Sequence, residues 1–274
     1  MRGGKLTREK KTAAELNHLS GPCAPLPFDT FARAESRLYR RGRIREEARM
    51  LSSDISPVCA NVYLPQCDSR LLIETMQRCC PPTGRRVADL CTGSGVAAIA
   101  AADAGADSVV AFDTSSAAIT ATCANARLAR RTVDARLGSW SAALELEPFD
   151  LVLCNPPYVP QPADREAEII GAGGPPTSFN AGPDGRLVLD PLCAATPALL
   201  KRGGVALIVQ SEFADVTRSV TALRQGGLHA GVVARRTIAF GPVMAARASW
   251  LEDTGRLAPG RRTEELVVVK AVKP

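Results

Sequence analysis

The chain has 274 residues, of which 46% are hydrophobic and 23% charged, and these proportions are typical of a globular protein with a sizeable core. Its purely apolar runs, such as residues 205–209 and 266–269, are far shorter than the roughly 20 residues of a membrane-spanning helix, which excludes a membrane protein. Residues 1–20 contain no secretory signal, so we expect a cytoplasmic protein.

The net charge of +6 is concentrated in one part of the chain. Residues 1–50 hold twelve Lys or Arg and six Asp or Glu, so the rest of the chain is neutral. We expect residues 1–57 to form a basic, partly helical arm and residues 58–274 to form the main domain. A solvated arm explains this charge, and the alternative is a contact surface for RNA or for an acidic or ribosome-associated partner.

Cysteine and histidine usage limits the possible chemistry. The nine cysteines, an odd number, include no C-x-x-C pair, and the two histidines are His18 and His229. A disulfide framework, a metal site and a Ser/His/Asp triad are therefore not predicted, and most hydrolases are excluded.

Short apolar runs alternate with helix-like stretches from residue 86 onward, which predicts an α/β fold with a mostly parallel sheet wound by helices. A polar segment rather than a crossover helix separates the last two strands, so these two strands are expected to pair antiparallel as a hairpin at one edge. The expected strands are residues 86–90, 108–113, 133–137, 149–154, 204–210, 232–240 and 264–270. The expected helices are residues 69–78, 96–104, 116–130, 187–200 and 212–225.

Two long connections interrupt this alternation. Residues 159–184 are rich in Pro, Gly and Ala, and a connection this much longer than the usual length of about 2 to 6 residues is typical of a lid or a disordered loop. Residues 243–262, which carry Trp250, lie inside the expected terminal hairpin, where we expect a surface excursion.

A glycine-containing turn follows the first expected strand. Residues 89–95 read D-L-C-T-G-S-G, in which Gly93 and Gly95 allow the backbone to bend and a ligand to approach. The helix that follows presents free NH groups to such a ligand. Asp113 ends the second strand, where its carboxylate can accept hydrogen bonds from ribose hydroxyls. The turn therefore predicts a nucleotide-like ligand.

Two cofactors fit this turn. Gly93-x-Gly95-x-x-Ala98 followed by an acid is also typical of nicotinamide-binding domains. Asp89 favours the other candidate, because a carboxylate there repels a pyrophosphate but suits the α-amino group and sulfonium of S-adenosyl-L-methionine. The structural alternative for Asp89 is a cap on the turn.

A second motif, Asn155-Pro156-Pro157-Tyr158, ends the fourth expected strand. Because proline has no backbone NH, two prolines terminate the strand and stiffen the turn above it. Ligands of doubly wound sheets bind at this edge, so the motif is predicted to form the catalytic site. The structural alternatives are packing for Tyr158 and hydrogen bonding to buried backbone groups for Asn155.

The residue types of this turn suit methylation of a planar nitrogen. An amide or aryl-amine nitrogen is a poor nucleophile because its lone pair is delocalised. The side-chain oxygen of Asn155 and the carbonyl of Pro156 can each accept a hydrogen bond from a substrate NH2 group and hold its nitrogen toward a tetrahedral shape. Tyr158 can cover the planar face of the substrate, and no strong general base is needed.

Taken together, these motifs resemble those of the HemK-type S-adenosylmethionine-dependent protein-glutamine N5-methyltransferases, in particular the short bacterial members similar to the eukaryotic release-factor methyltransferases. Residues 62–72, V-Y-L-P-Q-C-D-S-R-L-L, are similar to the family's V-Y-x-P-x-E-D-[ST]-x-L-L, and residues 181–186 are similar to its G-x-D-G segment. The resemblance runs from about Val62 to Val272. It implies a class I (Rossmann-like) methyltransferase fold with a seven-stranded, mostly parallel sheet.

The resemblance also implies roles for matched residues. Ser69, with Tyr63 and Asp68 beside it, is expected at the methionine end of the cofactor. Cys91 replaces the first glycine of the family's turn, and Cys67 replaces the Glu of its V-Y-x-P-x-E-D-[ST] segment. Ser139 and Trp140 replace an acid and a large residue that lie near the adenine in the family. Trp140 is expected to flank the adenine or, alternatively, to fill the core. The expected cofactor-binding residues are Ser69, Asp89, Cys91, Gly93, Gly95, Asp113, Ser139, Trp140 and Asn155, and the expected catalytic residues are Asn155, Pro156, Pro157 and Tyr158.

The sequence thus predicts methyl transfer from S-adenosyl-L-methionine to a planar nitrogen, with a protein glutamine side chain, as in a translation release factor, as the favoured acceptor. The alternative is an N6-adenine or N2-guanine methyltransferase acting on RNA or DNA, because the same turn serves an exocyclic amine. Residues 159–184 offer only Phe179 and Arg165 for base stacking, which favours a protein acceptor. A third hypothesis is a non-catalytic adaptor with a methyltransferase fold, which Cys91 and Ser139 allow.

Overall fold

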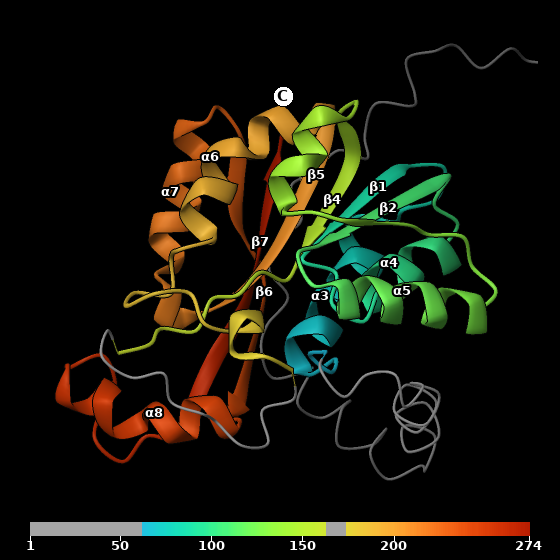
Figure 1. The fold of residues 1–274 in the computed structure, drawn as a ribbon. Coiled ribbons are helices and arrows are strands. Elements are labelled where there is room, and N and C mark those ends of the chain that lie inside the picture. Colours follow the sequence, from blue (N-terminus) through green and yellow to red (C-terminus); the bar gives the residue numbers. More distant parts are fainter. Residues whose placement is uncertain (1–61, 163–173) are drawn as a thin grey trace, which may run out of the picture. The chain divides into compact units, whose positions relative to one another are not determined.

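Residues 62–162 and 174–274 are described by the computed structural model (Figure 1). The predicted basic arm at residues 1–57 lies outside these ranges, and so do the middle residues of the loop predicted at 159–184. Within the two described ranges, no helix is both long enough and apolar enough to cross a membrane.

A seven-stranded sheet has the strand order β3-β2-β1-β4-β5-β7-β6. Neighbouring strands from β3 to β5 are parallel, whereas β7 is antiparallel to both β5 and β6. The predicted fold class and the antiparallel last strand are therefore confirmed. The strands are β1 (Arg86–Leu90), β2 (Ser108–Asp113), β3 (Asp134–Leu137), β4 (Phe149–Cys154), β5 (Leu200–Ser211), β6 (His229–Ala239) and β7 (Thr263–Val272).

Helices cover both faces of this sheet (Figure 1). On one face α4 contacts both α3 and α5, and on the other α6 contacts α7 and the 3-10 helix η3. The α-helices are α3 (Cys67–Cys79), α4 (Val96–Asp103), α5 (Ser116–Leu128), α6 (Leu189–Leu199), α7 (Val216–Gln225) and α8 (Pro242–Asp253). The 3-10 helices are η3 (Trp140–Glu145), η4 (Pro176–Ser178) and η5 (Glu212–Ala214).

Burial on both faces explains why the inner strands were recognisable in the sequence. A strand covered by helices on each side carries a nearly continuous apolar run rather than an alternating one. β4 is such a strand, and its residues Leu151 to Cys154 are all buried. β1 lies between β2 and β4. The connection after β1 therefore leads to β2 on one side, and the connection after β4 leads to β5 on the other, so the two connections diverge at the carboxyl ends of β1 and β4. Sheets of this kind bind ligands at that crevice, beyond the carboxyl ends of the strands.

The predicted surface excursion at residues 243–262 is wrong in its first half. α8 begins with Pro242 at its first turn, and its inward face buries Met244, Arg247, Ala248 and Leu251, which share one helical stripe.

The helix predicted at 212–225 is shorter than expected. η5 comes first, and Asp215, in a left-handed conformation, then caps α7 by accepting from Arg218 N at 3.0 Å.

Candidate active site

A cavity of about 290 Å³ lies beyond the carboxyl ends of β1, β2 and β4. Its walls bring together the glycine-containing turn, the Asn-Pro-Pro-Tyr turn, the start of α3 and residues of the segment 175–179. The start of α3 and this segment are more than a hundred positions apart in the chain. The predicted site residues that line the cavity are Ser69, Asp89, Cys91, Gly93, Asp113, Ser139, Trp140, Asn155, Pro156, Pro157 and Tyr158.

The predicted residue Gly95 does not line the cavity. It precedes α4 with a φ of 83°, and a Cβ placed on it would lie 2.8 Å from Cγ2 of Thr122 on α5. Glycine is therefore required there by close packing between the turn and α5 and by the left-handed backbone, rather than by the approach of a ligand. Thr122 also donates to Gly93 O at 3.1 Å, which fixes the turn from behind.

Asp113 holds the turn from the end of β2. One carboxylate oxygen accepts from Gly93 N and the other from Ser115 N, both at 2.9 Å. Each carboxylate oxygen can accept more than one hydrogen bond, so Asp113 can still receive hydroxyl groups of a ligand. Cys91, in the same turn, has a φ of 60°, a left-handed conformation in which glycine is the ordinary residue. Its thiol side chain is half-buried at the cavity wall.

Asp89 is a buried acid, 2% exposed. Its Oδ2 accepts from Thr92 Oγ1 at 2.6 Å and from Ala98 N at 3.0 Å, so the capping role considered for this residue is present. Within the described residues no cation pairs with Asp89. Burial raises the pKa of its carboxyl to about 7, although the two hydrogen bonds favour the ionised form. A ligand cation in the cavity would supply the missing counter-charge.

The Asn-Pro-Pro-Tyr turn, residues 155–158, follows β4 directly. Asn155 is half-buried and its Nδ2 donates to Ser69 Oγ on α3 at 3.3 Å. Pro156 is buried and Pro157 half-buried. Tyr158 is buried in the core, and its hydroxyl donates to Asp68 Oδ2 at 3.1 Å. The packing role considered for Tyr158 therefore accompanies its position on the cavity wall.

At the far end of the cavity, Ser139 and Trp140 begin η3. The Ser139 hydroxyl accepts from Ser141 N at 3.2 Å and also contacts the Ser141 hydroxyl, so it caps this helix. Trp140 is half-buried, packs against the core and lines the cavity, so the core-filling alternative and the ligand-facing position coexist.

Two buried arginines that hold the segments next to the Asn-Pro-Pro-Tyr turn were not predicted from the sequence. Arg247 of α8, 4% exposed, donates to Pro160 O at 2.7 Å and to Asn180 Oδ1, and its guanidinium lies 5.7 Å from the ring centroid of Phe179. It joins two segments that also pair with each other, since Val159 N donates to Phe179 O at 2.9 Å. Phe179 itself lines the cavity.

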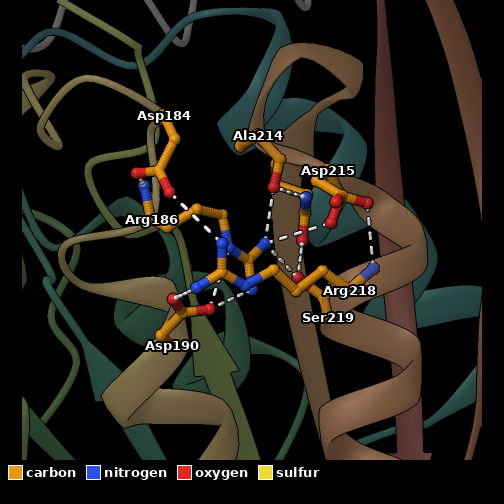
Figure 2. A network of polar contacts seen from close by, with 8 residues as sticks. Asp184, Arg186, Asp190, Ala214, Asp215, Arg218 and Ser219 are labelled. Carbon is orange, nitrogen blue, oxygen red and sulfur yellow. Dashed lines mark hydrogen bonds and ion pairs between the residues drawn. The ribbon is translucent and has the colours of Figure 1, made fainter.

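Arg186 anchors the segment that precedes α6 (Figure 2). Its guanidinium is buried between α6 and α7, where Nε and Nη2 donate to Asp190 Oδ1 at 3.0 and 2.7 Å. Nη1 donates to Ala214 O at 2.5 Å and to Ser219 Oγ at 2.7 Å. The neighbouring Gly185 packs closely against the Asn-Pro-Pro-Tyr turn, since a Cβ on it would lie 2.4 Å from Tyr158 O.

This close approach makes Gly185→Ala and Gly182→Ala a matched pair. Both glycines have a positive φ, 74° and 79°, so an alanine at either position costs about 1 to 2 kcal/mol of backbone strain. At Gly182 the nearest atom to the new methyl is Leu187 Cβ at 3.7 Å, which is ordinary contact. We expect Gly185→Ala to lower the free energy of unfolding by about 1 to 3 kcal/mol more than Gly182→Ala, as in overpacking. Urea denaturation of both variants measures this difference, and equal losses would contradict it.

Comparison with known proteins gives a concordant result. Residues 66–171 match the family described as Methyltransferase small domain. The release factor glutamine methyltransferase of Xylella fastidiosa is 36% identical over 150 residues, which are 54% of this chain and 54% of that protein. The chain thus spans about half the length of this relative. A putative protein N5-glutamine methyltransferase of Methanocaldococcus jannaschii is 28% identical over 187 residues, 68% of this chain and 91% of that protein.

A solved structure shares the fold. It is that of the Mtq2-Trm112 complex of E. cuniculi, responsible for the methylation of the eRF1 translation termination factor, and the match has a TM-score of 0.51 at 21% identity. It covers 78% of this chain and 99% of that chain. The predicted class I methyltransferase fold and the resemblance to the protein-glutamine N5-methyltransferases are therefore confirmed, and residues 66–171 match the methyltransferase small domain family.

Proposed function

We propose that this protein transfers a methyl group from S-adenosyl-L-methionine to the side-chain amide nitrogen of a glutamine in a protein. The observation that carries the proposal is that one cavity joins two complementary halves. The first half, with Asp89 and Asp113, suits a cationic nucleoside ligand, and the second, residues 155–158, suits an amide NH2 group. Named relatives that act on glutamine, including release factor methyltransferases, support this acceptor.

The first half fits the cofactor through its charge. Asp89 lacks a cationic partner within the described ranges, and the ammonium group of S-adenosylmethionine would provide one at a site where a buried carboxylate is otherwise unfavourable. Asp113 would receive the ribose hydroxyls, and Ser139 and Trp140 would border the adenine. When bound, S-adenosylmethionine supplies an electrophilic methyl group on a sulfonium.

The second half orients the acceptor. Asn155 Oδ1 and Pro156 O would each accept one hydrogen bond from the acceptor NH2 group, which draws its lone pair out of conjugation and aims it at the donor. The Tyr158 ring would cover the planar amide. As the new N–C bond formed, the methyl–sulfur bond of the cofactor would break, with its electron pair left on a neutral thioether sulfur. The methylated nitrogen would become acidic and release one proton to water, so none of the described residues has to act as a strong base.

Labelling with methyl-labelled S-adenosylmethionine in a cell extract tests the proposal. We expect the label to appear in protein, to resist ribonuclease, and to be released by acid hydrolysis as volatile methylamine, because an N-methylated amide hydrolyses to a carboxylic acid and methylamine. Label in RNA or DNA would instead support a nucleic-acid methyltransferase, and the absence of both cofactor binding and label would support an adaptor. A translation factor as acceptor would place the reaction in the cytoplasm.

A pH profile tests the role of Asp89. We expect the affinity for S-adenosylmethionine to rise between about pH 5.5 and 7.5, because the Asp89 carboxyl, with a pKa of about 7, must lose its proton before it can pair with a cation. Asp89→Asn should bind more weakly and lose most of this rise. Calorimetry at several pH values measures both effects, and a flat profile in the wild type would contradict the assignment.

Without ligand, the raised pKa of Asp89 makes the free energy of unfolding fall, rather than rise, with increasing pH. The native protein retains a proton on Asp89 that the unfolded chain has lost, so this group's contribution to the free energy of unfolding falls as the pH rises from about 4 to about 7. Burial also raises the pKa of Glu264 to about 7, so the Asp89→Asn variant is needed to separate the two groups.

A further inference from the structure

We propose that Asp68 and Ser69 form an orienting chain of hydrogen bonds that fixes the orientation of the Asn155 carboxamide. In this chain, Ser69 is a positioning residue for the substrate amide. This inference rests on the proposed function. It begins with the Asp68 carboxylate, which is 3% exposed and lies at the start of α3.

The Asp68 carboxylate accepts four hydrogen bonds. Oδ1 accepts from Ser69 N at 2.6 Å and from Ser69 Oγ at 3.3 Å, and Oδ2 accepts from the hydroxyls of Tyr63 and Tyr158, each at 3.1 Å. An ionised carboxylate can only accept, so each of these groups is the donor. Burial and the nearby Asp68 charge raise the pKa of both tyrosines above the ordinary value, so both keep their protons.

The direction of the next bond follows from this. A serine hydroxyl has one proton, and Ser69 donates it to Asp68, so toward Asn155 the Ser69 oxygen can only accept. The NH2 group is the sole donor of the Asn155 side chain, and it lies 3.3 Å from Ser69 Oγ. Oδ1 is consequently turned away from Ser69, and within the described residues it receives no hydrogen bond. It is the atom left to receive an incoming N–H.

The reverse orientation would present the wrong group. With its carboxamide flipped, Asn155 would offer an NH2 group to the NH2 group of a glutamine, and two donors cannot bond to each other. Asp68 also accepts from the hydroxyl of Tyr158. A single buried carboxylate therefore orients the first and last side chains of the Asn-Pro-Pro-Tyr turn, Asn155 through Ser69 and Tyr158 directly. The orienting chain thus favours a substrate that brings an N–H group to Asn155, as glutamine does. It disfavours a substrate that brings a hydrogen-bond acceptor there.

The test compares Ser69→Ala and Ser69→Thr with Thr75→Val. Thr75 lies on the same helix, is fully buried, and donates to Leu71 O, so its variant removes a buried hydroxyl outside the chain of bonds. We expect Ser69→Ala to lower kcat about 3- to 10-fold, the range for losing one neutral hydrogen bond, and to leave the KM for S-adenosylmethionine within about twofold. Ser69→Thr, which keeps the hydroxyl, should restore most of the rate, and Thr75→Val should not change it.

A second readout needs no turnover. In nitrogen-15 NMR spectra of the full-length protein, the side-chain NH2 signals of Asn155, assigned by their loss in Asn155→Asp, should shift in Ser69→Ala and stay unchanged in Thr75→Val. Unchanged signals in Ser69→Ala would overturn the inference, even if glutamine methylation is confirmed. A raised KM for S-adenosylmethionine with kcat unchanged would also overturn it and assign Ser69 to the cofactor. If the wild type methylates no glutamine, the proposed function fails, while the NMR result still decides the orientation.

Should Ser69→Ala not fold, Asp68→Asn provides the same test. An asparagine at this position can donate as well as accept, so the Ser69 proton is no longer committed to it and the Asn155 carboxamide loses its fixed direction. The Asn155 NH2 signals should then shift or split, and an unchanged pair of signals would overturn the inference.

Discussion

Replacing Asn155 by alanine is expected to lower turnover by a factor of about 100 or more, the usual result of removing one preorganised contact to the reacting group. The affinity for S-adenosylmethionine should change far less, because Asn155 is proposed to contact the substrate amide, and its side chain donates to Ser69 in the same cavity. Single-turnover rates at saturating cofactor, together with calorimetric binding of the cofactor, separate the two quantities.

Asp113→Asn is the contrasting variant. Asp113 receives the NH groups of Gly93 and Ser115 on the opposite side of the cavity, so its loss should act mainly on cofactor binding. We expect a weaker cofactor affinity and, at saturating cofactor, a turnover closer to that of the wild type than in Asn155→Ala. Near wild-type turnover in Asn155→Ala would remove Asn155 from the mechanism.

Arg186→Met is expected to lower the free energy of unfolding by about 1 to 3 kcal/mol, the cost of leaving buried hydrogen-bonding groups without their donor. The Arg186 guanidinium is 2% exposed and satisfies Asp190, two backbone carbonyls and Ser219 (Figure 2). Methionine fills much of the same space but donates nothing, so the buried acceptors Ala214 O and Ser219 Oγ lose this donor.

Arg218→Met is the matched control, since Arg218 belongs to the same network and its side chain is 50% exposed. It contacts Asp184 and Asp190, and exposed ion pairs of this kind contribute about 0 to 1 kcal/mol. Urea denaturation of the two variants measures the difference. Similar losses would show that burial does not set the strength of this network.

The sequence predicted the parts of this molecule that depend on local patterns. The inner strands were recognisable because burial on both faces makes them apolar throughout, as in β4. The two turns were recognisable because glycine permits backbone conformations that other residues avoid, and proline restricts the backbone, wherever they occur. The cavity then follows from topology, because strands that neighbour β1 bring both turns to one edge.

Features that depend on distant partners were not predictable in this way. α8 was missed because its buried face includes Arg247, a residue type that is ordinarily exposed and that here donates to Pro160 and Asn180. Gly95 was assigned to a ligand, whereas its neighbour Thr122 comes from another helix. The bond between Asp68 and Tyr158 joins residues 90 positions apart, and no periodicity in the chain indicates it.

β7 lies between β5 and β6, although it follows both of them in the chain. During synthesis, β5 and β6 therefore emerge before the strand that joins them, and each presents an open edge of unpaired NH and C=O groups. The buried residues of β5, including Leu207 and Ile208, are uncovered at the same stage, which invites wrong pairing with other chains. The nascent polypeptide stays vulnerable to misassociation until residues 263–272 have left the ribosome and closed the gap.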